Sequence, residues 1–162
     1  MTTAILRDER DLLWIVLDDV KIVGGSLVYD VHFLARAEPD QAPEPFVSTF
    51  GNREPREAFG SLLEELGRSV TGEVRALRHD PVSDGLSLEV KARSEGHEMC
   101  FEITAWLDLV RMNRAMKSRA VRGRHQSGLR LITTRAALES FRADLIGFAD
   151  PASEAAEWSE EG

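Results

Sequence analysis

The sequence has little that supports covalent or metal chemistry. It has one cysteine, Cys100, so an internal disulfide cannot form, and the surrounding apolar strand pattern is typical of a buried, inert thiol. The four histidines are scattered, with no two at ligand spacing on one expected element, so we expect no metal and no cofactor. A Walker-type phosphate loop, a dinucleotide-binding fingerprint and a nucleophile elbow are also missing. We therefore do not expect an enzyme.

Long apolar runs are missing too. No stretch approaches the roughly 20 apolar residues of a membrane helix, and charge appears at Arg7 to Arg10, too early for a secretory signal. We expect a cytoplasmic protein that does not enter a membrane. At 162 residues, 43% apolar and 30% charged, the chain is long enough for one globular domain with a substantial core.

Charge of one sign dominates most of the chain, whose net charge is −8. Residues 1–110 carry 11 basic and 21 acidic residues, whereas residues 111–130 carry seven basic residues and no acidic one. An acidic surface attracts basic partners and repels phosphate backbones, which argues against nucleic-acid binding by the whole domain. The basic stretch from Arg111 to Arg130 is either a patch for an acidic partner or RNA, or a solvated connector that pairs with the chain's own acids. We favour the connector.

A strand that leads into a helix is expected at 129–148. Leu129 and Leu131 alternate with Arg130, as in a strand with one buried face, and Thr133 or Thr134 can cap the helix that follows. The apolar face of this helix would consist of Ala137, Leu138, Phe141, Leu145 and Phe148. The rest of the chain must supply what this face covers.

The same unit occurs earlier in the chain. Residues 135–145 align without a gap with residues 56–66, sharing arginine, alanine, serine and leucine at four positions, and a strand at 46–50 matches the one at 129–133. Two amphipathic helices can look alike by pattern alone, but the matching strand favours duplication. We expect an α+β fold: a tandem pair of antiparallel β-meander units, each closed by one helix, at about 53–67 and 134–148, packed as one body.

This organisation divides the chain into a single α+β domain at 1–150, with halves at about 10–68 and 71–149, and an acidic, flexible tail at 151–162. Glycines 24 and 25 predict a hairpin between 12–23 and 26–36. A second hairpin is expected between 73–79 and 86–93, and 99–110 favours a long strand, although 106–121 also suits a helix.

Three details of the first half follow from residue type. Asp18 and Asp19 interrupt the first long strand, which indicates a bulge or a bend. Asn52 can cap the first helix, and Gly67 is a normal signal for its end.

Acidic residues gather in two expected loops. The proline-rich segment 37–45 contains Glu38, Asp40 and Glu44, and the turn at 80–85 contains Asp80 and Asp84. His79 followed by Asp80, with Asp84, is the nearest approach to a catalytic or metal constellation. Aspartates in turns usually bond to backbone, so we favour the turn role.

The layout resembles a known family. A hairpin, a strand and a helix are followed by Thr71-Gly72-Glu-Val, the strand Leu86-Ser-Leu-Glu-Val, a turn at Gly96, a long strand, and finally the run from Gly128 to Phe141. This order resembles bacterial immunity proteins similar to the WapI type, which are small cytoplasmic partners of contact-delivered polymorphic toxins, and related families of unknown function.

The resemblance implies a non-enzymatic inhibitor that binds a basic toxin domain and blocks its active site. The acids expected on loops are then the candidate partner-binding residues: Glu38, Asp40, Glu44, Asp80 and Asp84. Two alternatives stay open. One is a self-associating structural module that forms a homodimer through exposed strands, and the other is a domain that binds a small ligand in a pocket between the halves.

Overall fold

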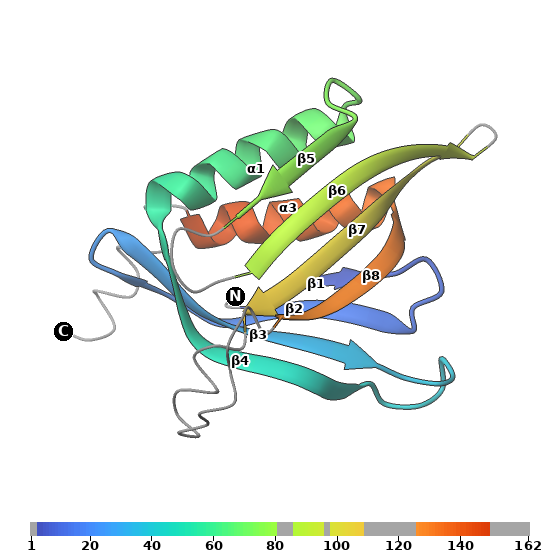
Figure 1. Cartoon of the computed structure of the whole chain (residues 1–162), viewed down its shortest axis with the longest axis horizontal. Helices are drawn as coiled ribbons and strands as arrows, with labels where there is room; N and C mark the ends of the chain where they lie inside the picture. The colour runs from blue at the N-terminus through green and yellow to red at the C-terminus, as the bar shows by residue number, and fades with distance from the viewer. Residues whose placement is uncertain (1–2, 81–85, 96–97, 109–125, 150–162) are drawn as a thin grey trace.

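The computed structural model describes residues 3–80, 86–95, 98–108 and 126–149, which form two four-stranded antiparallel sheets and two helices (Figure 1). The first half consists of β1 (Ala4–Arg7), β2 (Leu13–Val23), β3 (Ser26–Ala35), β4 (Glu44–Pro55) and α1 (Arg56–Val70). The second half consists of β5 (Ala76–His79), β6 (Leu86–Glu95), β7 (Glu98–Asp108), β8 (Gln126–Thr134) and α3 (Arg135–Ala149). Each sheet keeps its strands in chain order, which confirms the expected tandem meander units.

The first hairpin, formed by β2 and β3, is present as expected. The turn at Gly24 has a positive φ of 62°, which glycine adopts without steric cost. On β3 the core-facing side chains are at most 2% exposed, namely those of Leu27, Tyr29, Val31 and Phe33. The pairing of β2 with β3 shifts register between Asp18 and Lys21, which confirms a bulge.

The first helix differs from the prediction at its start. Asn52 does not cap it but lies within β4, where its side-chain amide donates to the carbonyl oxygens of Tyr29 at 3.2 Å and Thr49 at 3.3 Å. The strand expected at 46–50 therefore extends to Pro55, and α1 follows Pro55 without a side-chain cap. In the second half Thr134 does cap α3, since its hydroxyl accepts from the Ala137 N–H at 3.2 Å.

The first helix ends later than the expected residue 67. The α1 helix continues through Gly67 to Val70, because Gly67 provides room for contact with α3. Arg142 donates from Nε to the Leu63 carbonyl oxygen at 2.8 Å, and its guanidinium fills the space that a β-carbon at position 67 would need. A tertiary contact therefore overrides the usual stop signal.

Two further elements bear on the sequence predictions. The strand β1 was not expected; it pairs along its whole length with β2. The strand expected at 99–110 is confirmed by β7 as far as Asp108, whereas residues 109–125 and the tail at 151–162 lie outside the described residues. Cys100 is half-buried rather than buried.

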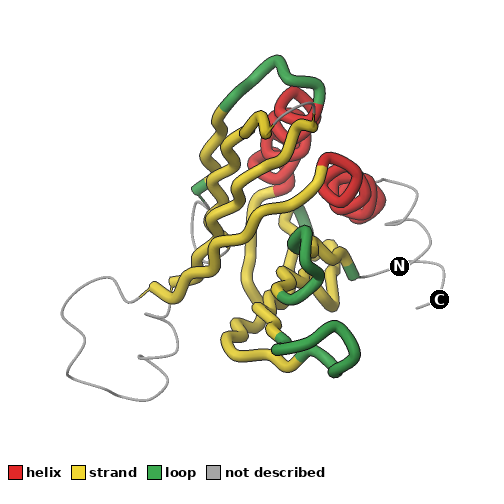
Figure 2. Tube along the Cα trace, turned by 90° about the vertical axis from the view of Figure 1, so that its right-hand side faces the viewer, coloured by secondary structure: helices red, strands yellow, loops and turns green. Residues whose placement is uncertain are grey.

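The two halves share their core. Both helices lie on the same face of the β5–β8 sheet, with the β1–β4 sheet beside them (Figure 2). The α1 helix packs on α3 and on β5 of the second half, while α3 packs on β1 of the first. The largest fully buried side chains come from both halves: Tyr29, Phe33, Phe59, Phe101 and Phe141. Each helix therefore covers the first strand of the opposite unit.

A bulge in β4 distinguishes the first half from the second. Two residues of β4, Phe50 and Gly51, stand opposite Asp30 of β3, and the N–H of Gly51 donates to the Asp30 carboxylate at 2.8 Å. The equivalent strands β7 and β8 pair without a shift. An extra residue reverses which face the preceding side chains take. By pairing with the preceding strand, Thr49, which is 9% exposed, is the counterpart of Leu129, which is 8% exposed, and the extra residue Phe50 is 64% exposed. The expected match of 46–50 with 129–133 is therefore wrong in its register.

We expect Gly51→Ala to lower the free energy of unfolding by about 1 kcal/mol, because Gly51 has φ 63° and an L-residue pays for this left-handed backbone. Gly60→Ala is the matched control: Gly60 is an exposed residue of α1 with open space around it, so alanine should stabilise the helix by about 1 kcal/mol. Urea denaturation measures both. A neutral or stabilising Gly51→Ala would contradict the bulge geometry.

Candidate functional site

Three of the predicted acids lie together on the first sheet. Glu38 and Asp40 are in the connection from β3 to β4, and Glu44 is the first residue of β4; all three are exposed. None of them forms an ion pair with another described residue. Arg36 fixes this loop, since its guanidinium donates to the Gln41 carbonyl oxygen at 3.2 Å and binds the Asp11 carboxylate at 2.7 Å.

Two exposed aromatic residues follow the acids on β4. Phe46 is 50% exposed and Phe50 is 64% exposed, whereas most large apolar side chains of the described residues are buried. The ring of Phe50 makes an edge contact with His32 at a centroid distance of 5.5 Å, and His32 Nδ1 lies 2.7 Å from Ser48 Oγ. This contact fixes an aromatic ring at the surface. We call Glu38, Asp40, Glu44, Phe46 and Phe50 together the β4 surface.

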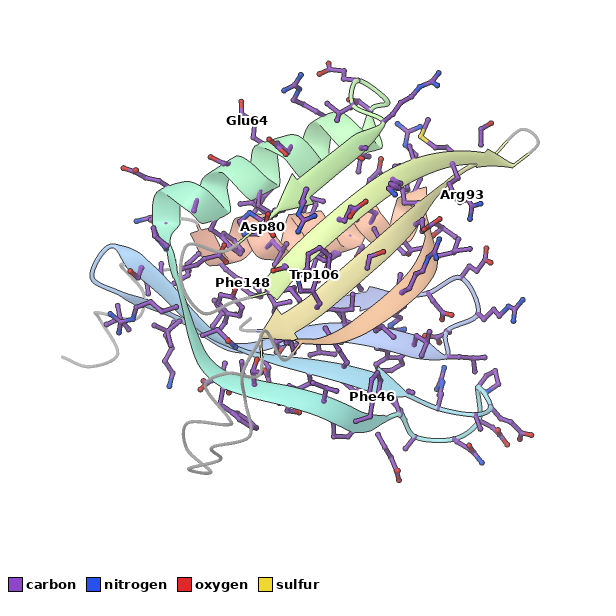
Figure 3. The ribbon with its side chains drawn as sticks, in the orientation of Figure 1. Phe46, Glu64, Asp80, Arg93, Trp106 and Phe148 are labelled. Carbon is purple, nitrogen blue, oxygen red and sulfur yellow. The ribbon has the colours of Figure 1, made fainter. Side chains whose placement is uncertain are left out.

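The other two predicted residues are not part of the β4 surface. Asp80 follows β5 on the second sheet, is exposed, and binds Arg78 Nε at 3.0 Å. Figure 3 shows it well apart from Phe46. Asp84 lies outside the described residues. The structure therefore brings together three of the five predicted residues and leaves Asp80 with a local partner.

A buried polar cluster, which sequence reasoning missed, joins the two halves. The Tyr29 hydroxyl donates to Glu54 Oε2 at 2.8 Å and accepts from the N–H of Leu86 at 3.2 Å. His79 Nε2 contacts the other oxygen of Glu54. Glu54 is 1% exposed, and a buried carboxylate needs such partners because burial removes its water. Two strands of the first half thus bind the second half through one carboxylate.

Electrostatics at this cluster favour the neutral phenol. Burial raises the pKa of the Tyr29 hydroxyl well above its usual range, and the Glu54 carboxylate adds to that increase. His79 faces Glu54 and Asp80 faces Arg78, so the two neighbouring residues do not converge on one site. The cluster is placed to hold the halves together rather than to meet a ligand.

The duplication supports this structural role. Glu54 and Thr133 occupy equivalent positions, each two residues before its helix. Thr133 donates from its hydroxyl to the Arg7 carbonyl oxygen at 2.7 Å, and the N–H of Glu9 donates to the Ile132 carbonyl oxygen at 2.7 Å. The last strand of each unit therefore binds the first strand of the other unit close to its C-terminal end. Glu54 makes this contact through its carboxylate, and Thr133 makes it through its hydroxyl.

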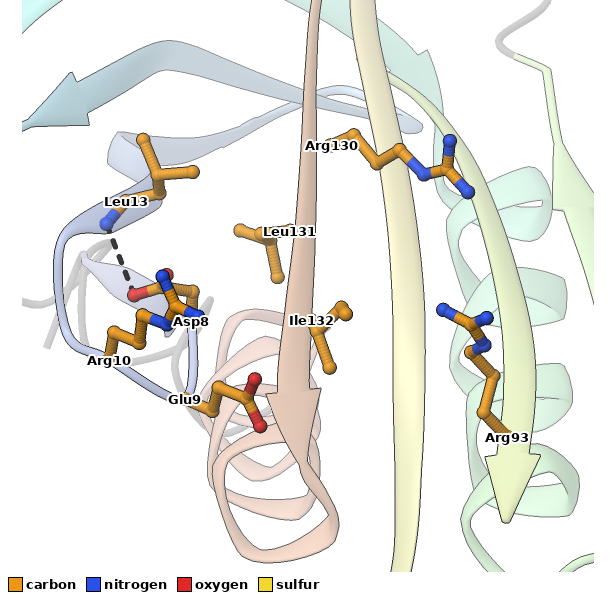
Figure 4. Close-up of a pocket in the computed structure, with 8 residues that line it drawn as sticks. All are labelled: Asp8, Glu9, Arg10, Leu13, Arg93, Arg130, Leu131 and Ile132. Atoms are coloured by element: carbon orange, nitrogen blue, oxygen red, sulfur yellow. Dashed lines mark hydrogen bonds between the residues drawn. The ribbon is translucent and has the colours of Figure 1, made fainter. Parts of the chain in front are cut away.

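A groove of about 340 Å³ lies between the halves, beside the turn from β1 to β2 (Figure 4). Its lining consists of Asp8, Glu9, Arg10, Leu13, Arg93, Arg130, Leu131 and Ile132. Arg93 and Arg130 both bind Glu102, which is 8% exposed, with Arg93 Nη1 at 3.1 Å from Oε2. Two of the three arginines that line the groove are thus already paired. The groove therefore offers space for a ligand but few uncommitted charges.

Arg130 is also the one member of the basic stretch at 111–130 that lies within the described residues. Its pairing with Glu102 agrees with the connector interpretation at that position. The other basic residues of the stretch lie outside the described residues.

The chain's single tyrosine allows a direct test of the buried cluster. The raised pKa means that folding keeps the proton on Tyr29, so this contribution to stability is complete below about pH 10 and is lost as the pH rises further. We expect tyrosinate absorbance to appear together with loss of the far-ultraviolet circular dichroism of the fold. Ionisation of Tyr29 near pH 10 in a protein that stays folded would contradict the buried hydrogen bonds.

Removal of the hydroxyl tests the same cluster at neutral pH. We expect Tyr29→Phe to lower the free energy of unfolding by about 2 kcal/mol at pH 7, because a Glu54 oxygen and the Leu86 N–H each lose a buried partner. Ser48→Ala is the control, since it removes a hydrogen bond from the half-buried outer face and should cost less than about 1 kcal/mol. Equal losses in urea denaturation would argue against a buried junction.

Comparisons with known proteins do not assign a family: no family model matches the chain, and no curated protein shows significant similarity to it. Within the described ranges, no three histidine, cysteine, aspartate or glutamate residues are grouped so that they could hold a metal ion. No helix among those residues is long and apolar enough to cross a membrane. The function must therefore be argued from the surfaces themselves.

Proposed function

We propose that this chain is a non-enzymatic binding protein, an immunity protein that neutralises a bacterial toxin in the cytoplasm by covering the toxin's active site. The observation that carries the proposal is the β4 surface, on which three acids without ion-pair partners among the described residues precede two exposed aromatic rings along the chain. The layout resemblance to immunity proteins of the WapI type is consistent with it.

Charge supports a basic partner. The chain has a net charge of −8, and three acids of the β4 surface add an uncommitted negative patch. Toxins that attack nucleic acids bind phosphate through basic surfaces, so an acidic protein can compete for the same cleft. Opposite charges also accelerate the encounter, because the attraction acts before contact.

The aromatic residues supply the apolar contact area that charged residues lack. Exposed charge pairs at the rim of an interface contribute mainly to association rate and specificity. Buried aromatic anchors near the centre contribute most of the binding free energy in many interfaces. Phe46 and Phe50 follow Glu44 on β4 by two and six residues, and both lose exposed apolar area when a partner covers them. The β4 surface therefore combines a charged rim with an apolar centre.

The same surface also favours one alternative, a homodimer that pairs the exposed β4 strands of two copies. Light scattering after size-exclusion chromatography distinguishes it, because the alternative requires a dimer of the chain alone at micromolar concentration. The immunity role instead requires a complex with a different, basic protein.

The proposal is tested with a toxin domain encoded beside this chain. The C-terminal domain of an adjacent large secreted protein is produced in bacteria with and without the chain, and growth and co-purification are measured. Restored growth together with a stable complex supports the immunity role. A toxin that stays lethal and elutes separately would overturn it.

We expect the triple variant Glu38→Lys, Asp40→Lys, Glu44→Lys to reduce the association rate with the basic toxin by about tenfold at low salt, because steering depends on these charges. The rate should also become less sensitive to salt. The matched control reverses the same number of exposed acids on α1, at Glu57, Glu64 and Glu65, and so changes net charge equally. If both variants slow association to the same degree, the β4 surface is not the contact.

A further inference from the structure

We propose that β4 receives an extended, basic segment of the partner as an additional antiparallel strand of the first sheet. The proposal rests on the proposed function and names its mode of binding. Strand addition of this kind uses backbone hydrogen bonds along an open sheet edge, with side-chain contacts for specificity.

Among the described residues, the edge of the first sheet carries no further strand along the first part of β4, from Glu44 to Phe50. The strand is 12 residues long and pairs with β3 on one side only among the described residues (Figure 1). The other sheet edges are either short or covered: β1 and β5 have four residues each and carry α3 and α1, respectively. The edge strand β8 is bonded by the N–H of Glu9. An unpaired strand edge is a ready template for another chain.

Side chains on β4 are arranged to anchor an added strand. Phe50 contacts His32 on the outer face of the sheet, whereas Phe46 lies at a second register shift of β4 and its ring is 6.2 Å from the core-facing ring of Phe33. The two partly exposed rings therefore flank the edge of β4 on opposite faces, about 13 Å apart along the strand. A segment laid beside β4 would place its alternate side chains against these rings. The bulge at Gly51 is what turns Phe50 to the outside, and bulges next to binding sites commonly redirect side chains in this way.

Charge selects the occupant and its direction. The three acids of the β4 surface lie at or before the N-terminal end of β4, in the loop 36–43 and at Glu44. Every described strand pair in this protein is antiparallel, so an added strand would run with its C-terminal end toward these acids. Lysine or arginine is therefore expected at the C-terminal end of the segment. A second copy of this chain fits less well, because two copies that each carry −8 repel one another.

The test uses a capped peptide, acetyl-Thr-Val-Thr-Val-Thr-Val-Arg-Arg-amide, with the intact chain. Residue-resolved amide hydrogen exchange should show protection between Phe46 and Phe50 when the peptide is added. The first control has the same composition with both arginines at the N-terminal end, and we expect it to bind about tenfold more weakly. The second control consists of two peptides, one N-methylated at every valine and one at every threonine, so that each has one hydrogen-bonding edge blocked. At least one of them should no longer protect the amides between Phe46 and Phe50.

Variants of the chain complete the test. Phe50→Ser should weaken peptide binding about tenfold, and this side chain is 64% exposed, so the fold stays intact. Glu38→Lys with Asp40→Lys and Glu44→Lys should abolish the preference for C-terminal arginines. Absence of protection at Phe46 to Phe50, or equal binding of the two arginine placements, would overturn strand addition.

The two proposals fail in different ways. If the toxin is neutralised in a complex that leaves the β4 amides unprotected, the immunity role stands and strand addition is wrong. If the basic peptide protects β4 but no toxin is neutralised, strand addition stands and the immunity role is wrong.

Discussion

The structure depends on the packing of each helix against both halves of the chain. A four-stranded antiparallel sheet has one apolar face, and neither unit's own helix covers that face alone. The α3 helix packs on β1, α1 packs on β5, and the two helices pack on each other, with Arg142 of α3 bound over Gly67 of α1. Burial of each large apolar side chain in this shared layer contributes about 2 kcal/mol, so the halves stabilise one another. This also explains why the junctions at Glu54 and Thr133 bind the opposite unit's first strand.

Local pattern predicts much of this fold, since most of its elements are amphipathic. The alternation at 86–93 specifies β6, and the two aligned helices appear at 56–70 and 135–149. What the pattern misses is decided by contacts distant in sequence. The strand β1 has only four residues and gains its pairing from β2, while Gly67 stays helical because Arg142 lies against it. Neither contact can be recognised from the sequence around β1 or around Gly67.

The candidate site likewise contains some residues that the sequence identifies and others that only the structure identifies. Clustered acids with prolines already indicate an exposed loop, so Glu38, Asp40 and Glu44 can be identified from composition. The exposure of Phe46 and Phe50 cannot, because alternation alone does not say which face of a strand meets the core. The buried cluster leaves a weak signal. Glu54 is a charged residue where the second copy has Thr133, but its partners lie 25 residues away in each direction along the chain.

The difference between the two copies locates the surface on which function is proposed. Thr49 and Leu129 hold equivalent positions opposite the preceding strand, and both are buried. The extra residue of the first copy, Phe50, faces solvent because of the bulge at Gly51, whose φ of 63° is costly for other residues and whose N–H binds Asp30. Folding alone does not require this bulge, since β7 and β8 form the same pairing without one. A backbone irregularity that exposes an aromatic ring on an edge strand, whose N-terminal end follows three uncommitted acids, is better explained by binding than by stability.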